Sequence, residues 1–179
     1  DLHRGYPCPV VANVGNHDCV YGDIVYLDQQ PLGVLFATGV FRRCFDEHEV
    51  YFAKAHAERV PRAFPFDRKS GSWIKSNPFA LPDQDGPIVR VVGVPYHGTV
   101  YDMGRFTAIR KGEEDHLVVM AHLLASPMGG SMFEGEDIVK YEALDDLGAS
   151  AVVWGHWHKD QGIIKRGSTY HVNVGSLSR

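Results

Sequence analysis

Three short groups of polar side chains in this chain have the residue types that bind metal ions and move protons. The first is Asn16-His17-Asp18, which follows Gly15, the second is His122 alone, and the third is His156-Trp157-His158. Imidazole nitrogens and carboxamide oxygens are ligands for divalent transition metals. A metal site with histidines available for proton transfer is therefore the first hypothesis.

Each group also has a purely structural explanation. If a strand continues through His156-Trp157-His158, both imidazoles point to the same side and can bind the same ion. Otherwise they are two loop histidines beside a buried tryptophan. His122 alone, at a strand end, is more often a structural histidine than a ligand. Asn16-His17-Asp18 offers a carboxamide ligand and a histidine held by an aspartate, but Gly, Asn and Asp are also the residues of a plain turn.

Short apolar strands are the elements that must position these groups. Residues 9–14, 117–121 and 151–154 are apolar runs, and each run stops at one of the three groups. Layered α/β folds place their sites in loops at the carboxyl ends of strands. The polar residues of the three groups are therefore expected to be neighbours in space.

The remaining pattern indicates a mixed α/β fold. Helices are predicted over 32–40 and 137–147, with Gly39 and Gly148 at their carboxyl ends, and further strands over 50–52, 88–94, 162–164 and 170–174. The last two form a predicted hairpin. Residues 53–87 are rich in proline and glycine and are predicted to be mostly loop.

Composition limits the classes of protein that remain. The chain has 179 residues, of which 44% are apolar and 22% charged, so a single globular domain over 1–179 is expected. No apolar run is long enough to span a membrane. The net charge of −4 argues against a strongly basic nucleic-acid-binding protein. The three cysteines form no CxxC pair, which favours a reducing, cytoplasmic environment.

The order of the motifs resembles that of the calcineurin-like metallophosphoesterases. The family signature is D-x-H, G-D-x-x-D, G-N-H-D/E, a strand-end histidine and G-H-x-H. The last three blocks match here as residues 15–18, His122 and residues 155–158, and residues 173–176 (NVGS) resemble the closing N-P-G-S of the family. Gln30-Pro31-Leu32-Gly33-Val34-Leu35 looks like phage and bacterial members of the DNA-repair exonuclease type.

The resemblance implies a two-sheet β-sandwich flanked by helices, without its N-terminal strand or strands. It also implies two divalent metal ions, manganese first and iron, zinc or nickel as alternatives, that clamp a phosphate ester. The implied residue roles are these: Asn16, His122 and His156 bind one ion, His158 binds the other, His17 contacts the phosphate or protonates the leaving oxygen, and Asp18 orients His17. The implied location is the cytoplasm of a bacterial or phage-infected cell.

The first two blocks of the signature are absent. Asp1-Leu2-His3 lies too close to Gly15 to be the D-x-H block and is interpreted as coincidence, and Gly22-Asp23 lies on the wrong side of the Asn16 motif. The matching residues provide no carboxylate to bridge two ions. A missing N-terminal segment or a companion chain is therefore expected to supply these ligands. The absence of an initiator methionine agrees with this expectation.

Three functions from different classes stay open. The first is a hydrolase of phosphodiesters or phosphomonoesters, with DNA as one substrate. Segment 54–75 favours it, with six lysines and arginines against two carboxylates and with aromatic residues between them, although a solvated loop is the alternative. Tyr96 and His97 are expected to border the cleft or to be structural. The second function is a non-catalytic scaffold, and the third is a mononuclear metal-binding module.

Overall fold

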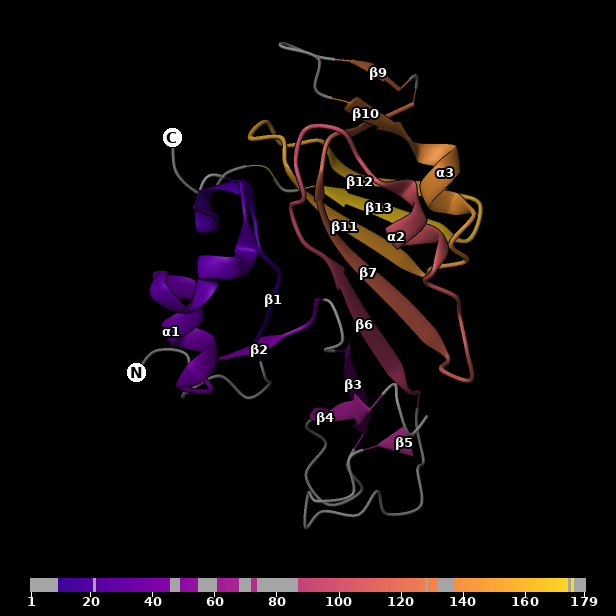
Figure 1. Ribbon diagram of the computed structural model, residues 1–179. Coiled ribbons are helices and arrows are strands. Elements are labelled where there is room, and N and C mark those ends of the chain that lie inside the picture. The colour runs from indigo at the N-terminus through magenta and orange to yellow at the C-terminus, as the bar shows by residue number, and fades with distance from the viewer. Residues whose placement is uncertain are drawn as a thin grey trace.

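The computed structural model describes residues 10–20, 22–45, 49–54, 61–67, 72–73, 87–127, 129–131, 137–173 and 175 (Figure 1). The helices are two 3₁₀ helices and three short α-helices: η2 (Asn16–Asp18), η3 (Ile24–Gln29), α1 (Pro31–Ala37), α2 (Met103–Thr107) and α3 (Tyr141–Asp145). The strands are β1 (Val10–Ala12), β2 (Phe41–Arg43), β3 (Glu49–Lys54), β4 (Pro61–Asp67), β5 (Ser72–Trp73), β6 (Val89–Val94), β7 (His116–Leu123), β8 (Ala125–Ser126), β9 (Gly130–Ser131), β10 (Asp137–Lys140), β11 (Ala151–His156), β12 (Gly162–Arg166) and β13 (Thr169–Asn173).

One eight-stranded mixed sheet organises the described residues. Its strand order is β12-β13-β11-β7-β6-β3-β4-β5. The central strands β6, β7, β11 and β13 are parallel, so their carboxyl ends lie at the same edge. The remaining strands of this sheet pair antiparallel. The mixed α/β class is confirmed, and the packing of two sheets in a sandwich remains a prediction.

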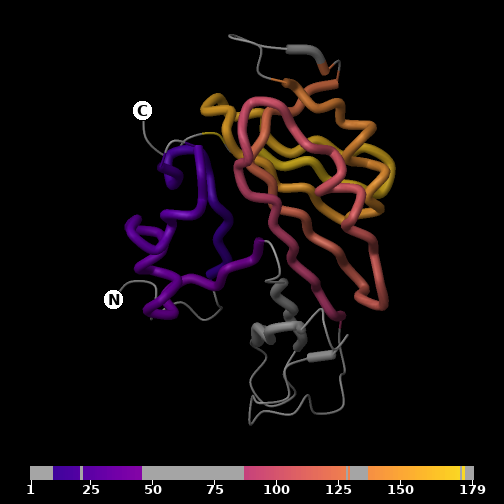
Figure 2. The backbone as a smooth tube through the Cα atoms, viewed as in Figure 1, coloured from indigo at the N-terminus to yellow at the C-terminus, as the bar shows by residue number. Residues whose placement is uncertain are grey.

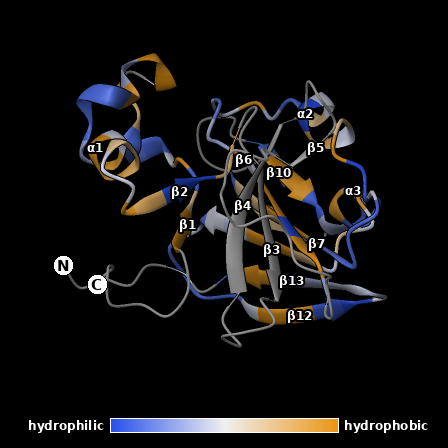
Figure 3. Ribbon diagram, turned by 90° about the horizontal axis from the view of Figure 1, so that it is seen from below, coloured by the Kyte–Doolittle hydropathy of each residue, from blue (hydrophilic) through white to orange (hydrophobic). Residues whose placement is uncertain are grey.

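The two faces of the sheet are covered by different parts of the chain. Along β7, alternate residues starting at Leu117 are buried against α2 and α3, where Phe106 and Leu144 complete the main core. Val118 and Met120 point to the other face, toward β1 and Cys44. His122 continues this second series. Figure 3 shows apolar stretches in the central strands and hydrophilic ones in many of the surrounding segments.

Residues 10–45 form a lobe that lies beside the second face of the sheet (Figure 2). Its strands β1 and β2 pair in parallel. The Asn13 carboxamide attaches this lobe to the sheet, because its Nδ2 donates to Val94 O at 2.7 Å and to Met120 O at 3.2 Å. One side chain thus fixes the end of β1 relative to the carboxyl ends of β6 and β7.

The structure confirms several predicted elements and corrects two. The apolar runs that precede the three polar groups are β1, β7 and β11, and β12 and β13 form the predicted hairpin. The helix predicted over 137–147 is wrong in its first turn. Residues Asp137–Lys140 form strand β10, which pairs with β8 and β9, and only Tyr141–Asp145 are helical. Strand pairing outweighs the helical spacing of the apolar residues here.

The prediction of loop over 53–87 is wrong where β4 and β5 lie. Pro61 and Pro65 both pair with β3, opposite Lys54 and Val50, whereas β5 pairs only with Phe66 and Asp67. Among the described residues the other edge of β4 is therefore open at both prolines, and an open edge tolerates proline. No side chain of the basic segment 54–75 is described, so its surface lies outside the described residues, as do Asp1-Leu2-His3 and residues 176–179. In the described part of the chain, no helix is long and apolar enough to cross a membrane.

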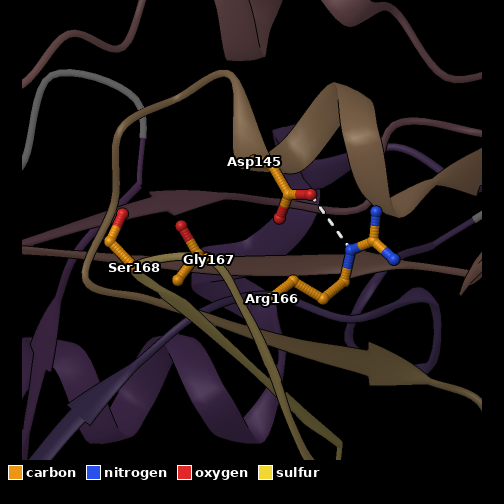
Figure 4. A pocket seen from close by; sticks show the side chains of 5 residues that line it. Asp145, Arg166, Gly167 and Ser168 are labelled. Atoms are coloured by element: carbon orange, nitrogen blue, oxygen red, sulfur yellow. Dashed lines mark hydrogen bonds and ion pairs between the residues drawn. The ribbon is translucent and has the colours of Figure 1, made fainter.

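A partly buried charge network joins α3 to the β12–β13 hairpin, on the side of the sheet that carries α3. Asp145 Oδ1 lies 2.6 Å from His171 Nε2, and Asp145 Oδ2 accepts from Arg166 Nε at 3.0 Å (Figure 4). His171 is only 1% exposed, and Tyr141 stacks on its ring with centroids 4.7 Å apart. Asp145 therefore anchors the helix to two neighbouring strands.

Replacing Asp145 with alanine is expected to lower the free energy of unfolding by about 1–3 kcal/mol, because the buried His171 loses its partner and Arg166 keeps only Glu142. Urea unfolding followed by circular dichroism measures this change. Asp146→Ala is the matched control, since the Asp146 side chain is exposed one position further along the chain. Equal effects of the two substitutions would contradict the anchoring role.

Candidate metal centre

Three strand ends bring Asn16, His122 and His156 together. Asn16 begins η2 just after β1, His122 is the penultimate residue of β7, and His156 ends β11. His122 Nε2 lies 3.0 Å from Asn16 Oδ1 and 3.0 Å from His156 Nδ1. Three residues that are far apart in sequence thus direct an oxygen and two nitrogens to one point, as the strand-end argument predicted.

This donor set fits a divalent ion. Ligand atoms in adjacent positions around one ion, at bond lengths of about 2.1 Å, lie roughly 3.0 Å apart in octahedral geometry. Burial, together with the smaller effect of the neighbouring imidazoles of His156, His17 and His158, lowers the pKa of His122 to about 4. A neutral imidazole at neutral pH is the form that binds a metal.

The backbone at His156 separates the two histidines of the third group. His156 has a φ of +88°, and it is the only non-glycine residue with positive φ among the described residues. This conformation is strained for a side chain with a Cβ, and such strain is typical of functional sites. Strand β11 ends at His156, so strand alternation does not determine the relative orientation of the two imidazoles, although both residues line one pocket.

His158 lies instead beside His17. The two ring centroids are 6.2 Å apart, and both side chains are exposed. His122 and His156, in contrast, are half-buried with centroids 4.8 Å apart. The site therefore has an inner pair of imidazoles with Asn16 and an outer pair open to solvent. The outer pair is accessible to a bound substrate.

Asp18 stabilises the loop that carries Asn16 and His17. Its Oδ2 accepts a hydrogen bond from the Gly15 backbone N–H at 3.0 Å, and its own N–H donates to Gly15 O at 3.1 Å. These bonds close η2 into a single compact turn. The described contacts of the Asp18 carboxylate are thus to the Gly15 backbone, and its predicted action on His17 remains a prediction.

Two glycines leave room for the His122 ring. A Cβ added at Gly15 would lie 2.8 Å from His122 Cε1, and one added at Gly155 would lie 3.4 Å from His122 Nδ1. The Gly15 backbone has φ −100° and ψ 175°, which any residue adopts. Gly15 is therefore needed for the space beside the imidazole and not for its backbone conformation.

Replacing Gly15 with alanine is expected to displace the His122 imidazole and to weaken divalent-metal binding about ten-fold or more, comparable with the loss of an outer-shell contact. Gly155→Ala, whose added methyl meets the same ring at an ordinary contact distance, is expected to have a smaller effect. Isothermal titration of each variant with Mn²⁺ measures both affinities. Equal affinities for the two variants would show that the tight contact at Gly15 is unimportant.

Tyr96 and Asn13 complete the surroundings of the site. The pocket beside the three donors has a volume of about 380 Å³, and its lining includes Asn13, His122, His156 and His158. Asn13 stands in the apolar run before Gly15, and only the tertiary structure reveals that it joins three strands. Tyr96 borders the site, as one reading of the sequence predicted, with its ring centroid 5.8 Å from that of His122.

His97 has a structural role instead. Its Nδ1 lies 2.9 Å from Pro95 O, and its Nε2 accepts from Asp102 N–H at 3.0 Å, so the ring closes the turn after β6. Cys19, beside the Asn16 motif, directs its Sγ to Gly15 O at 3.3 Å, and burial raises the pKa of its thiol. Neither side chain is a candidate ligand.

The described residues supply ligands for one ion more fully than for two. Asn16, His122 and His156 converge, whereas His158 is the one predicted ligand of the other ion. Across the part of the chain that the structure describes, no three or more His, Cys, Asp or Glu side chains form a metal-binding group. Asn16, His122 and His156 are not such a group, because one of the three is an asparagine. A second ion would need carboxylates from elsewhere.

Comparison with known proteins gives one match. No curated protein and no solved structure matches the chain significantly. The model of the calcineurin-like phosphoesterase family matches residues 2–160, which include the Asn16 motif, His122 and the His156-Trp157-His158 group. With a match over most of its length and a convergent Asn, His, His donor set, the chain belongs to the calcineurin-like phosphoesterase family.

Proposed function

We propose that this chain is the larger part of a metal-dependent hydrolase that cleaves phosphodiester or phosphomonoester bonds at a two-metal centre. The observation that carries the proposal is the convergence of Asn16 Oδ1 and His156 Nδ1 on His122 Nε2, each at 3.0 Å. These three residues would hold one ion, and His158 would contribute to the other. When bound, such ions act as Lewis acids on the phosphoryl group and activate the attacking water.

The outer histidines would handle the substrate. His17 and His158 are exposed at the mouth of the site, where a phosphate ester has access to them. A protonated His17 would donate a hydrogen bond to a phosphoryl oxygen or a proton to the leaving oxygen. Asp18, through the Gly15 backbone, would keep η2 and hence His17 at a fixed position.

Carboxylate ligands from outside the described residues would complete the centre. Neutral groups alone do not offset the charge of two divalent ions, which favours a bridging carboxylate. We propose that a further N-terminal segment or a companion chain supplies it, together with the first strand or strands of a two-sheet sandwich. In this proposal the chain is a single domain that forms the C-terminal portion of the family domain.

The proposed substrate class is a phosphodiester, with DNA as one candidate. The segment Gln30–Leu35, similar to that of phage and bacterial exonuclease-type members, supports it, as does the basic composition of residues 54–75. Manganese is the first choice of ion, since the ligands are nitrogen and oxygen without thiolate. The sparse cysteines support a reducing, cytoplasmic location, and the resemblance of Gln30–Leu35 supports a bacterial or phage-infected cell.

Hydrolysis of bis(p-nitrophenyl) phosphate with added Mn²⁺ tests the proposal. This chain and a longer chain extended at its N-terminus are compared, and bound metal is counted in both. Activity with two ions per molecule in the longer chain, and one bound ion without activity in this chain, support the proposal. Activity of the shorter chain would contradict the proposed need for further ligands, and inactivity of both with no bound metal would favour a scaffold.

A mononuclear metal-binding module is the second candidate. It is favoured by the uneven ligand supply, because Asn16, His122 and His156 converge on one position, whereas His158 is the one predicted ligand of a second ion. Metal content separates the candidates. One tightly bound ion in the longer chain, without hydrolysis of the diester, would favour the binding module.

A further inference from the structure

Tyr96 occupies a position between the three elements of the metal centre. It follows β6 by two residues, and β6 lies directly beside β7, which carries His122. Its backbone N–H donates to Val14 O at 2.9 Å, immediately before the Gly15 turn. The residue is thereby attached to the segment that carries Asn16. Its side chain is half-buried beside the imidazoles that the other two strands contribute.

The Tyr96 ring contacts both inner imidazoles. Its centroid lies 5.8 Å from that of His122 with an interplanar angle of 85°, an edge-to-face contact. It lies 5.9 Å from the centroid of His156 at an angle of 40°. Aromatic rings at these separations attract one another in preferred orientations. One ring therefore restricts the rotation of both imidazoles whose nitrogens lie 3.0 Å apart.

The surroundings hold Tyr96 in place on both sides. His97 closes the turn that follows, through Pro95 O and the Asp102 N–H. On the other flank, a Cβ added at Gly22 would lie 4.0 Å from Tyr96 Cε1, so the ring reaches as far as the loop after η2. A ring anchored in this way is suited to orienting its neighbour His156, whose backbone is strained.

We propose that Tyr96 is a positioning residue of the metal centre. Its aromatic ring fixes the imidazole planes of His122 and His156 so that their nitrogens face one ion. The inference rests on the proposed metal-binding role of these histidines. The ring itself carries the effect, so phenylalanine at this position retains it and an aliphatic residue of similar size loses it.

Titration of the 179-residue chain with Co²⁺ tests this role, because the visible absorption of bound Co²⁺ reports ligand geometry as well as affinity. Tyr96→Leu is expected to weaken Co²⁺ binding about ten-fold and to change the spectrum, whereas Tyr96→Phe stays within about two-fold of the unsubstituted chain. Tyr170→Leu is the matched control, since Tyr170 is 43% exposed on β13. Tyr96→Met replaces Tyr96→Leu if the latter does not fold.

The outcomes separate this proposal from the proposed function. Unchanged affinity and spectrum in Tyr96→Leu or Tyr96→Met overturn the positioning role while leaving the metal site intact. A loss in Tyr96→Phe as large as in Tyr96→Leu assigns the effect to the hydroxyl and overturns the role of the ring. Failure of the unsubstituted chain to bind Co²⁺ overturns the metal site and, with it, the role of Tyr96.

Discussion

Replacing His122 with alanine is expected to weaken divalent-metal binding by more than about 100-fold, beyond the loss expected for an outer-shell group. The reason is geometric, because His122 Nε2 is the atom that lies 3.0 Å from both Asn16 Oδ1 and His156 Nδ1. Without the His122 imidazole, Asn16 Oδ1 and His156 Nδ1 lose the ligand atom that lies next to both of them. Isothermal titration with Mn²⁺ measures the loss, and hydrolysis by the complete enzyme is expected to disappear with it.

His116→Ala provides the control for this substitution. His116 lies at the opposite end of the same strand β7, where its exposed side chain pairs with Ser150 Oγ at 3.2 Å. It is expected to leave metal binding unchanged. Retention of tight Mn²⁺ binding by a folded His122→Ala variant would contradict the assignment of His122 as a ligand.

Replacing His17 with alanine is expected to lower kcat of the complete enzyme by about 10²–10⁴-fold, the usual contribution of a general acid or base. Metal content is expected to stay unchanged, because His17 is exposed and lies with His158, outside the convergent set. Steady-state hydrolysis of bis(p-nitrophenyl) phosphate measures kcat, and metal analysis of the same samples measures occupancy.

The contrast between His17→Ala and His122→Ala distinguishes a substrate-handling histidine from a ligand. Loss of metal together with kcat in His17→Ala would make His17 a ligand instead. An unchanged kcat would remove it from the catalytic machinery. His116→Ala serves again as the control, since it removes an imidazole that lies at the far end of β7.

The position of the site was predictable from the sequence because it depends on strand ends. The parallel strands β7 and β11 bring His122 and His156 to one edge, where their apolar runs stop. Asn16 joins them from the end of β1, which belongs to a separate two-stranded sheet. The end of the strand at His156, before His158, was not predictable from strand alternation, because it is accompanied by a positive φ at His156. The roles of Asn13 and Tyr96 depend on contacts across three strands, which no local sequence pattern reveals.

Local patterns also failed where pairing decides the secondary structure. Apolar residues at helical spacing favoured a helix from residue 137, but Asp137–Lys140 join a sheet with β8 and β9. The prolines at 61 and 65 favoured a loop, but this segment forms strand β4, which pairs with β3. By contrast, Gly39 and Gly148 have φ of +71° and +67° just beyond α1 and α3, as their predicted capping positions require.

X-ray diffraction from crystals of the chain grown with Mn²⁺, recorded at the manganese absorption edge, tests the central claim most directly. The account predicts an anomalous peak within bonding distance of Asn16 Oδ1, His122 Nε2 and His156 Nδ1. A bound ion at any other place, or none at these three atoms at saturating Mn²⁺, would contradict it.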